Sequence, residues 1–332
     1  MTDTTKPQPS GLRMPSMSVL GPIIALLVLL AIGAAMNSNF LSAANITNVL
    51  ARSAFIGIIA VGMTFVITAG GLDLSVGSMA AFIAGLMILV MNAALPSMGI
   101  GIPIILLGMV TAIIAGMLAG LLNGFLITTL GIEAFIVTLG SMGIYRSLVT
   151  WLADGGTLSL DFGLRTFYRP VYFDGILGVS WPIIVFALVV IIGEFIMSRT
   201  AYGRHCAATG SNEHVAHYSN VNVRRTRLIS YAALGILVGI ATIMYVPRLG
   251  SASASTGVLW ELEAIAAVII GGTVLKGGFG RVWGTVIGVL ILSLIGNILN
   301  LTDFVSPYLN GAIQGIIIIL AVILQRERKT AN

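Results

Sequence analysis

Residues 54–95 read AFIGIIAVGMTFVITAGGLDLSVGSMAAFIAGLMILVMNAAL and decide the class of fold. Two apolar runs, 54–70 and 75–95, lie on either side of a short turn that contains a glycine pair. About twenty apolar residues in a helix, at about 1.5 Å per residue, cross a hydrocarbon core of about 30 Å. The stretch therefore predicts two membrane-spanning helices joined by a tight turn.

The whole chain of 332 residues shares this character. Hydrophobic residues make up 57% of it, charged residues 9%, and the mean hydropathy is +1.03. Soluble domains contain about 25% charged residues, and a soluble chain of this size could not hide so much apolar surface from water. The composition excludes a soluble domain, an intrinsically disordered chain and a nucleic-acid partner. It predicts an all-α polytopic membrane protein embedded in a lipid bilayer.

Ten apolar runs have the length of a membrane span, so we expect about ten transmembrane helices. The runs cover residues 19–36, 54–70, 75–95, 99–122, 132–152, 179–197, 228–246, 260–275, 282–299 and 307–324. The transmembrane domain then covers 19–324, between short tails at 1–18 and 325–332. We expect the eighth run to end at Lys276-Gly277-Gly278.

The distribution of Lys and Arg predicts the orientation, because cytoplasmic segments carry an excess of these residues. With the N-terminus inside, the inner segments hold twelve of them and the outer segments hold four, Arg52, Arg165, Arg169 and Arg248. This excess predicts that both termini lie in the cytoplasm, as an even number of spans requires.

Glycines four residues apart recur in three of the runs. They are Gly116, Gly120 and Gly124; Gly235 and Gly239; and Gly284 and Gly288. Such glycines share one helix face and allow a neighbouring backbone to approach closely. We expect helix packing within the bundle, with dimerisation through one of these faces as the alternative.

Placing a polar residue in the membrane costs free energy, so each such residue is a candidate functional residue. Asp73 and Ser75 follow the Gly70-Gly71 turn, where a carboxylate can accept bonds from the free N–H groups of a helix start. Structurally they form a cap, and functionally they are candidates for a gate or for the lining of a permeation path at a broken helix.

A second group lies at the outer start of the eighth run, in Trp260-Glu261-Leu262-Glu263. Two acids at a helix start are favoured by the helix dipole, which is the structural interpretation of Glu261 and Glu263. Arg146 lies at a similar depth and could pair with either acid. With Trp260 they could also bind a hydroxyl-rich ligand, and these four residues are further candidates for the translocation pathway.

Residues 198–227, SRTAYGRHCAATGSNEHVAHYSNVNVRRTR, form by far the longest inner loop. Asn212 and Glu213 precede His214–Tyr218 as in a capped short helix. A short helix flanked by arginines suits docking to a partner protein, and a basic loop lying on anionic lipid headgroups is the alternative.

Catalytic and metal-binding patterns are not found in the sequence. His214 and His217 are three residues apart but have no third ligand spaced nearby, so we expect no metal site. No lysine stands in a GxxxxGK[ST] motif, and we expect neither ATP hydrolysis nor any other catalysis by this chain, nor a bound cofactor. The single cysteine, Cys206, excludes an internal disulfide.

Four motifs in the same order resemble the permease subunit of ribose-type ABC importers, a monosaccharide branch that includes xylose, arabinose, galactose and autoinducer-2 systems. They are AVGMTFVITAGGLDLSVGS at 60–78, AFIVTLGSMGIYR at 134–146, TAYGRHCAATGSNEHVA at 200–216 and ELEAIAAVIIGGTVLKGGFGRVWGT at 261–285. The resemblance covers about 20–324. Glu263 departs from the aspartate usual in the family, Asn220 from a common glycine, and Glu133 from a less polar residue.

The resemblance implies a core of two permeases, either two copies of this chain or this chain with a paralogue, in the cytoplasmic (inner) membrane of a bacterium. It further implies separate ABC ATPase subunits that use ATP–Mg, and a periplasmic sugar-binding protein that delivers the ligand. It also implies that the 198–227 loop is the coupling element seated in the ATPase, with Gly203, Arg204, Gly210, Asn212, Glu213 and Ala216 as its residues.

Two other kinds of function stay open at this point. In an ion-coupled secondary transporter, Asp73, Glu261 and Glu263 would be the coupling acids. An ABC permease for another small solute, such as a branched-chain amino acid, is the other alternative.

Overall fold

The structure is a computed structural model, and it describes residues 17–302, 309, 311–313, 315–316 and 319. Its long helices are α1 (Met17–Met36), α2 (Ala43–Thr68), α3 (Val76–Met98), α4 (Ile102–Thr129), α5 (Ala134–Leu152), α8 (Trp181–Arg199), α11 (Val223–Leu249) and α13 (Val282–Thr302). The shorter helices are α6 (Phe162–Tyr168), α7 (Pro170–Phe173), α9 (Ala201–Ser211), α10 (Glu213–Tyr218) and α12 (Trp260–Ile270).

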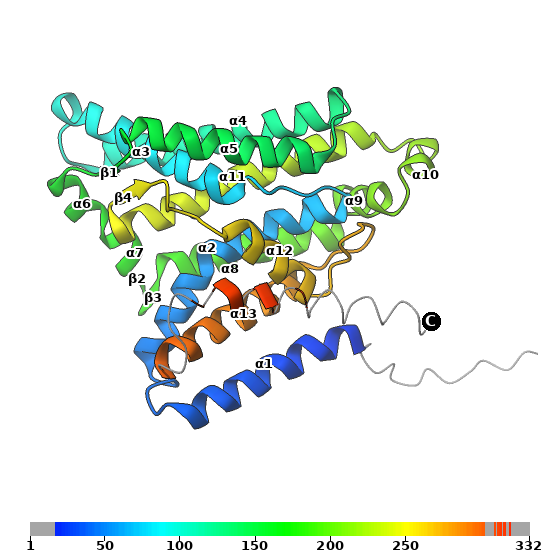
Figure 1. The fold of residues 1–332 in the computed structure, drawn as a ribbon, viewed down its shortest axis with the longest axis horizontal. Coiled ribbons are helices and arrows are strands. Elements are labelled where there is room, and N and C mark those ends of the chain that lie inside the picture. Colours follow the sequence, from blue (N-terminus) through cyan, green and yellow to red (C-terminus); the bar gives the residue numbers. More distant parts are fainter. Residues whose placement is uncertain (1–16, 303–308, 310, 314, 317–318, 320–332) are drawn as a thin grey trace, which may run out of the picture.

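The long helices lie side by side in one bundle (Figure 1). Figure 1 shows α9 and α10 at one end of the bundle, and α6, α7 and all four short strands toward the other. We refer to these as the α9–α10 end and the α6–α7 end.

Within the described residues, seven helices are long and apolar enough to cross a membrane, namely α2, α3, α4, α5, α8, α11 and the Val282–Leu301 part of α13. They match seven of the ten expected spans, so the prediction of a multi-pass membrane protein is confirmed. The apolar part of α1, Leu20–Met36, is shorter than a full span, and the expected tenth span, 307–324, lies largely outside the described residues.

The eighth expected span is wrong in length. We expected it over 260–275, but α12 has 11 residues and ends at Ile270, with Gly271 as its C-cap. At about 1.5 Å per residue it is about 16 Å long, roughly half of a bilayer core. The chain then turns at Gly272, whose φ is +90°, and residues 271–281 form an irregular segment before α13.

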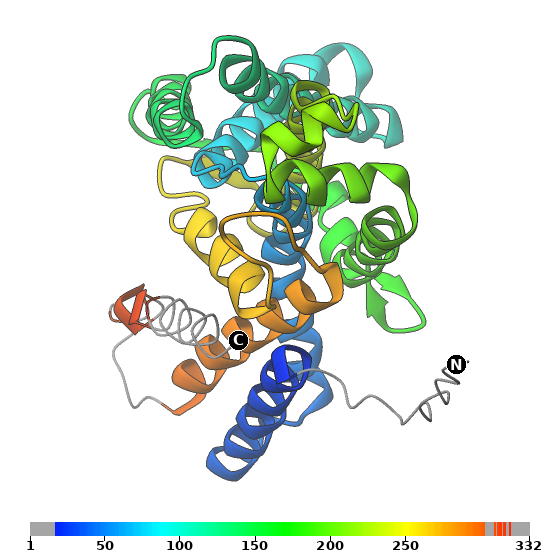
Figure 2. The ribbon, with the colours of Figure 1, turned by 90° about the vertical axis from the view of Figure 1, so that its right-hand side faces the viewer.

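The second expected span begins too late. We placed its start at residue 54, whereas α2 begins at Ala43, where the Ser42 hydroxyl accepts a hydrogen bond from the Asn45 N–H at 3.3 Å. Arg52, expected in an outer segment, therefore lies within α2 with its side chain exposed. Among the seven spans α2 is the most deeply buried, and it contacts α8, α11, α12 and α13 (Figure 2).

The expected packing role of the glycines is confirmed for the pair α4 and α11. A Cβ atom added to Gly116 would lie 2.2 Å from the Gly235 carbonyl oxygen, and one added to Gly239 would lie 2.5 Å from the Ala112 oxygen. In the same way, a Cβ on Gly288 would lie 2.0 Å from the Ala267 oxygen of α12. These glycines let two helix backbones touch inside the bundle.

Two small antiparallel sheets lie at the α6–α7 end. β1 (Thr157–Ser159) pairs with β4 (Ser251–Ser253), with Leu158 opposite Ala252. β2 (Gly175–Ile176) and β3 (Val179–Ser180) form a hairpin directly before α8. The β1–β4 pair joins the segment after α5 to the segment after α11, so it fixes the loop that leads into α12.

Candidate functional site

The expected coupling element is built from two helices, α9 and α10. Asn212 is the N-cap of α10, and its side-chain oxygen accepts a hydrogen bond from the Val215 N–H at 3.1 Å. Ala216 is buried beneath α10, whereas Val215 and Tyr218 are 60% and 88% exposed. The capped short helix expected from the sequence is confirmed, and it exposes Val215 and Tyr218 beside Glu213, His214 and His217.

Asn220 ends α10 in a left-handed conformation, with φ of +61°. Asparagine tolerates this region, in which glycine is usual at a helix end. The N–H groups of Asn220 and Val221 donate to the carbonyls of His217 and Ala216, both at 3.0 Å. The departure from glycine at this position therefore leaves the helix end intact.

Gly210 places α9 against two other segments of the α9–α10 end. A Cβ on Gly210 would lie 2.0 Å from the Thr68 oxygen, 2.6 Å from the Gly278 nitrogen and 3.0 Å from the Gly277 Cα. The Gly278 N–H also donates to the Thr68 oxygen at 3.0 Å. The end of α2, the 271–281 segment and α9 therefore meet backbone to backbone.

Gly203 makes a similar contact at the start of α9. A Cβ there would lie 2.1 Å from the Met197 oxygen at the end of α8. Arg204 follows it and is exposed on the same helix. The α8–α9 corner thus has a tightly packed inner side and a charged outer side.

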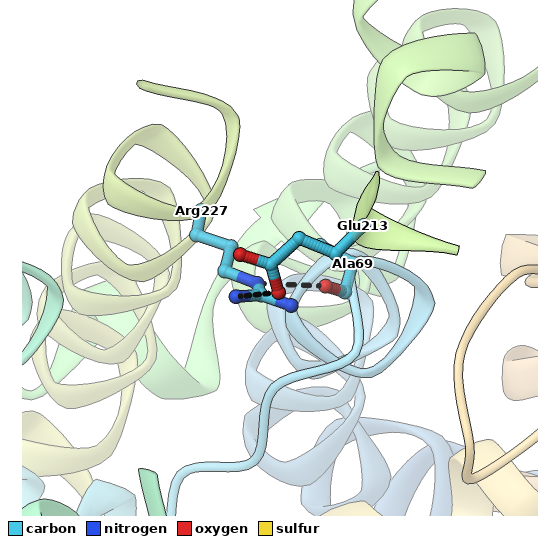
Figure 3. Close-up of polar contacts among 3 residues, drawn as sticks. All are labelled: Ala69, Glu213 and Arg227. Carbon is cyan, nitrogen blue, oxygen red and sulfur yellow. Dashed lines mark hydrogen bonds and ion pairs between the residues drawn. The ribbon is translucent and has the colours of Figure 1, made fainter. Parts of the chain in front are cut away.

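An ion pair connects α10 to the core of the bundle (Figure 3). Arg227 lies in the first turns of α11, and its Nη1 is 2.9 Å from the Glu213 Oε2. Its Nε donates to the Ala69 carbonyl oxygen at the end of α2, at 3.2 Å. One guanidinium thus bridges α10 and α2, a role that the sequence did not predict for Arg227.

A pocket of about 780 Å³ opens beside this ion pair. It is lined by the turn between α4 and α5, by the turn between α10 and α11, and by Gly70 and Gly71. Glu133, at the N-cap position of α5, also lines it. The pocket separates α10 from the start of α5.

Asp73 and Ser75 lie deep in the bundle and are fully buried. Asp73 Oδ1 accepts hydrogen bonds from the Ser75 N–H at 2.8 Å and from the Ser75 hydroxyl at 2.6 Å. Ser75 occupies the N-cap position of α3, but its side chain makes no capping bond. The expected cap is thus supplied by Asp73, which satisfies the N–H group of Ser75.

The Asp73 carboxylate also joins two spans. Its Oδ2 accepts from the Asn123 side chain in α4 at 3.1 Å, and the Asn123 oxygen accepts from the Ser141 hydroxyl in α5 at 2.6 Å. Tyr231 of α11 holds the preceding residue, since its hydroxyl donates to the Leu72 oxygen at 3.0 Å. Asn123 stands out in the sequence as a lone amide in an apolar run, but nothing there pointed to Ser141.

The start of α12 contacts the start of α3, close to the Asp73 turn. A Cβ on Gly77 would lie 2.1 Å from the Gly257 oxygen and 2.4 Å from the Glu261 Oε2, so only glycine fits. Glu261 and Glu263 lie in the first turn of α12, as the sequence predicted. Within the described part of the chain, the buried Glu261 Oε2 has no hydrogen-bond partner.

The expected pairing of Arg146 with an acid is electrostatic, toward Glu261, while its hydrogen bonds go to backbone carbonyls. Its Nη1 donates to the carbonyls of Ala254 and Thr256, at 2.6 and 2.5 Å, in the loop before α12. Glu261 lies within electrostatic reach of this guanidinium. Arg146 therefore holds the loop before α12 against α5. It also lines a shallow pocket together with Thr150 and Trp151 of α5.

Trp260 is packed among aromatic side chains. Its ring is stacked on Phe55 with 6.4 Å between centroids and meets Tyr245 edge-on at 5.0 Å. The preceding residue, Leu259, has φ of +68°, which is unusual for a bulky side chain. The aromatic cluster fixes the start of the half-helix against α2 and α11.

Comparisons with known proteins agree on one kind of protein. Residues 45–322 match the family described as branched-chain amino acid transport system / permease component. The chain is 38% identical to the ribose import permease protein of Bacillus subtilis, over 94% of each of the two chains. It is 36% identical to the ribose import permease protein of Haemophilus influenzae, over 90% of each chain. It is 30% identical to the xylose transport system permease protein of Haemophilus influenzae, over 96% of this chain and 98% of the relative.

Proposed function

The chain belongs to the family of the branched-chain amino acid transport system permease component, and from this membership we propose that it is the membrane-spanning subunit of an ATP-driven sugar importer. The proposed solute is a monosaccharide or a related small polyhydroxylated compound. The membrane is the cytoplasmic membrane of a bacterium, with α9 and α10 on the cytoplasmic side. A separate ABC ATPase hydrolyses ATP, a periplasmic binding protein delivers the sugar, and a second permease copy or paralogue completes the path.

Family membership carries this proposal, and the exposed side chains of α10 support the docking of the ATPase. Val215 and Tyr218 expose apolar and aromatic area at the end of a membrane bundle, where a lone chain would gain nothing from it. Aromatic residues of this kind are enriched at the centres of protein interfaces. Burial of these two side chains in a cleft of a partner protein would be more favourable than their exposure to water.

The contacts behind α10 supply a route from that surface into the spans. A displacement of α10 pulls on Arg227 through Glu213, and Arg227 holds the end of α2 through Ala69. A displacement of α9 pushes through Gly210 on the end of α2 and on the 271–281 segment. The end of α2 leads into the Asp73 turn, and the 271–281 segment directly follows α12.

The proposed gate lies where α3 and α12 begin. Both helices start inside the bundle, and their starts touch through Gly77 and Gly257. Broken helices of this kind are where transporters place their substrate and gating residues. In this proposal Asp73 and Ser75 position the start of α3, whereas Arg146, Trp260, Glu261 and Glu263 hold or line the start of α12.

Co-purification from mild detergent tests the proposed partner. We expect the tagged chain to retain an ATPase with a nucleotide-binding P-loop, and the double variant Val215→Asp/Tyr218→Asp to lose it while keeping the same yield and unfolding temperature. Phe162→Asp is the matched control, because Phe162 is 83% exposed at the opposite end of the bundle. Equal retention of the ATPase by the double variant and the control would refute the docking role of α10.

A second measurement separates the proposal from ion-coupled transport. Uptake by the intact importer should follow the ATP concentration inside the vesicles and persist when an ionophore dissipates the ion gradients. Loss of uptake in the presence of the ionophore, with ATP maintained, would instead favour a secondary transporter.

A further inference from the structure

The β2–β3 hairpin at the α6–α7 end has a surface that the transport proposal does not use. It projects sideways beyond α8 in the view along the bundle (Figure 2). Ile176 and Val179 face each other across the hairpin and are 53% and 41% exposed, and Leu177 at its tip is 98% exposed. Phe173, just before the hairpin, is 51% exposed. Four large apolar side chains are therefore exposed in and beside the hairpin.

The tip of the hairpin is unfavourable in water for two reasons. Leu177 and Gly178, the two central residues of the turn, have φ of +53° and +80°. This kind of tight turn favours asparagine, aspartate or glycine at its first central position, because a bulky side chain is strained there. The sequence places a leucine at that position and leaves it almost completely exposed. Strain at an exposed position suggests a functional role for the side chain.

The level of the hairpin along the bundle matches the surface of a bilayer. Helix α8 begins at Trp181, directly after β3, and has 19 residues, so it is about 28 Å long and just spans a core of about 30 Å. Trp181 then lies at the interface between core and headgroups, where tryptophan is enriched. The hairpin must lie at the same depth, beside the headgroups of that leaflet.

Helix α8 also exposes apolar side chains in the half that lies away from the hairpin. Leu188, Ile191, Ile192 and Phe195 are each more than half exposed along that helix. Arg169 lies at the edge of the surface, with its guanidinium 4.7 Å from the centre of the Phe173 ring. One aspartate, Asp174, lies at the base of the hairpin, where its carbonyl accepts the Trp181 N–H at 3.0 Å.

We propose that the β2–β3 hairpin and Phe173 form a lipid anchor, which inserts Leu177 and Ile176 below the headgroups and places Arg169 beside the lipid phosphates. At a bilayer surface apolar side chains are favoured among the acyl chains and cations are favoured among the anionic headgroups, which matches Leu177 and Arg169. The anchor fixes the level of α8 in the bilayer, and α8 leads directly into α9. The proposal concerns lipid and does not depend on the transported solute.

Depth-dependent fluorescence quenching tests the anchor in the full-length chain. The Cys206→Ser variant removes the native thiol, and Leu177→Cys on this background carries a bimane probe in bilayer discs of phosphatidylcholine and phosphatidylglycerol. We expect strong quenching by lipids with a nitroxide just below the headgroup and weak quenching by aqueous iodide. Asp154→Cys, in an exposed polar loop at the same end, is the water-facing control. Iodide quenching at position 177 equal to that at position 154, without quenching by the nitroxide lipid, would overturn the anchor.

A second variant separates anchoring from turn geometry. Leu177→Asn suits the left-handed turn better, so on backbone grounds alone it stabilises the hairpin. We expect it nevertheless to reduce several-fold the nitroxide quenching of a probe at Ile176→Cys, since the apolar tip is lost. Unchanged quenching with a raised unfolding temperature would overturn the proposal. Shielding from iodide that required an added protein would assign the surface to a protein partner and would also overturn it.

Discussion

Replacing Gly210 by alanine puts a methyl group where three backbone atoms already lie. The new carbon would be 2.0 Å from the Thr68 oxygen, and ordinary contact begins at 3.4 Å, so α9 or the end of α2 must move by about 1.4 Å. Neither neighbour is the flexible end of a side chain. The same movement disturbs the hydrogen bond from the Gly278 N–H to the Thr68 oxygen.

The magnitude follows from two opposing effects. Overpacking of this kind costs about 1–3 kcal/mol, and alanine in place of glycine within a helix returns about 1 kcal/mol. We therefore expect a net destabilisation of about 0–2 kcal/mol, toward the upper end because the atoms in the way are backbone atoms. The larger effect should be on coupling, because the displaced contact is the one through which α9 reaches α2 and the 271–281 segment.

The assay compares sugar uptake with ATP hydrolysis in the assembled importer, alongside thermal unfolding of the purified chain. Gly210→Ala should lower the unfolding temperature and reduce the sugar taken up per ATP. Gly296→Ala is the matched control, since Gly296 lies within α13 and no atom of the described residues would lie within 4 Å of the added carbon. If the two variants unfold at the same temperature and couple equally well, the packing argument is wrong.

Three further predictions rest on single contacts. Asn123→Ala leaves the Asp73 Oδ2 without its donor and should lower the free energy of unfolding by about 1–3 kcal/mol, which denaturation in mild detergent measures; an unchanged value would contradict the network. Glu213→Gln should cost less than about 1 kcal/mol in stability, because the Glu213 side chain is 53% exposed, yet it should reduce uptake relative to wild type. Burial raises the pKa of the Cys206 thiol, so maleimide labelling of the folded chain should stay slow at mildly alkaline pH and accelerate on unfolding; fast labelling before unfolding would refute the burial.

The sequence predicted local features well because they depend on neighbouring residues. The capped helix after Asn212, the two acids in the first turn of α12 and the left-handed Asn220 follow from short-range rules of helix ends. The partners of Arg146 could not be predicted in this way. Its two carbonyl acceptors lie more than a hundred residues further along the chain. Every residue has a backbone carbonyl, so the sequence does not indicate which carbonyl accepts a bond.

The sequence was enough to predict the membrane class, seven of the spans and the capped short helix after Asn212, because apolar length and helix caps are local quantities. Only the tertiary structure shows that α12 stops at Ile270, after roughly half of a membrane span. The apolar run continues to Leu275, so an apolar count places the end of this helix too late. The helix ends where Gly271 packs against α13, since a Cβ on Gly271 would lie 2.3 Å from the Gly284 carbonyl carbon, and only folding brings these two residues together.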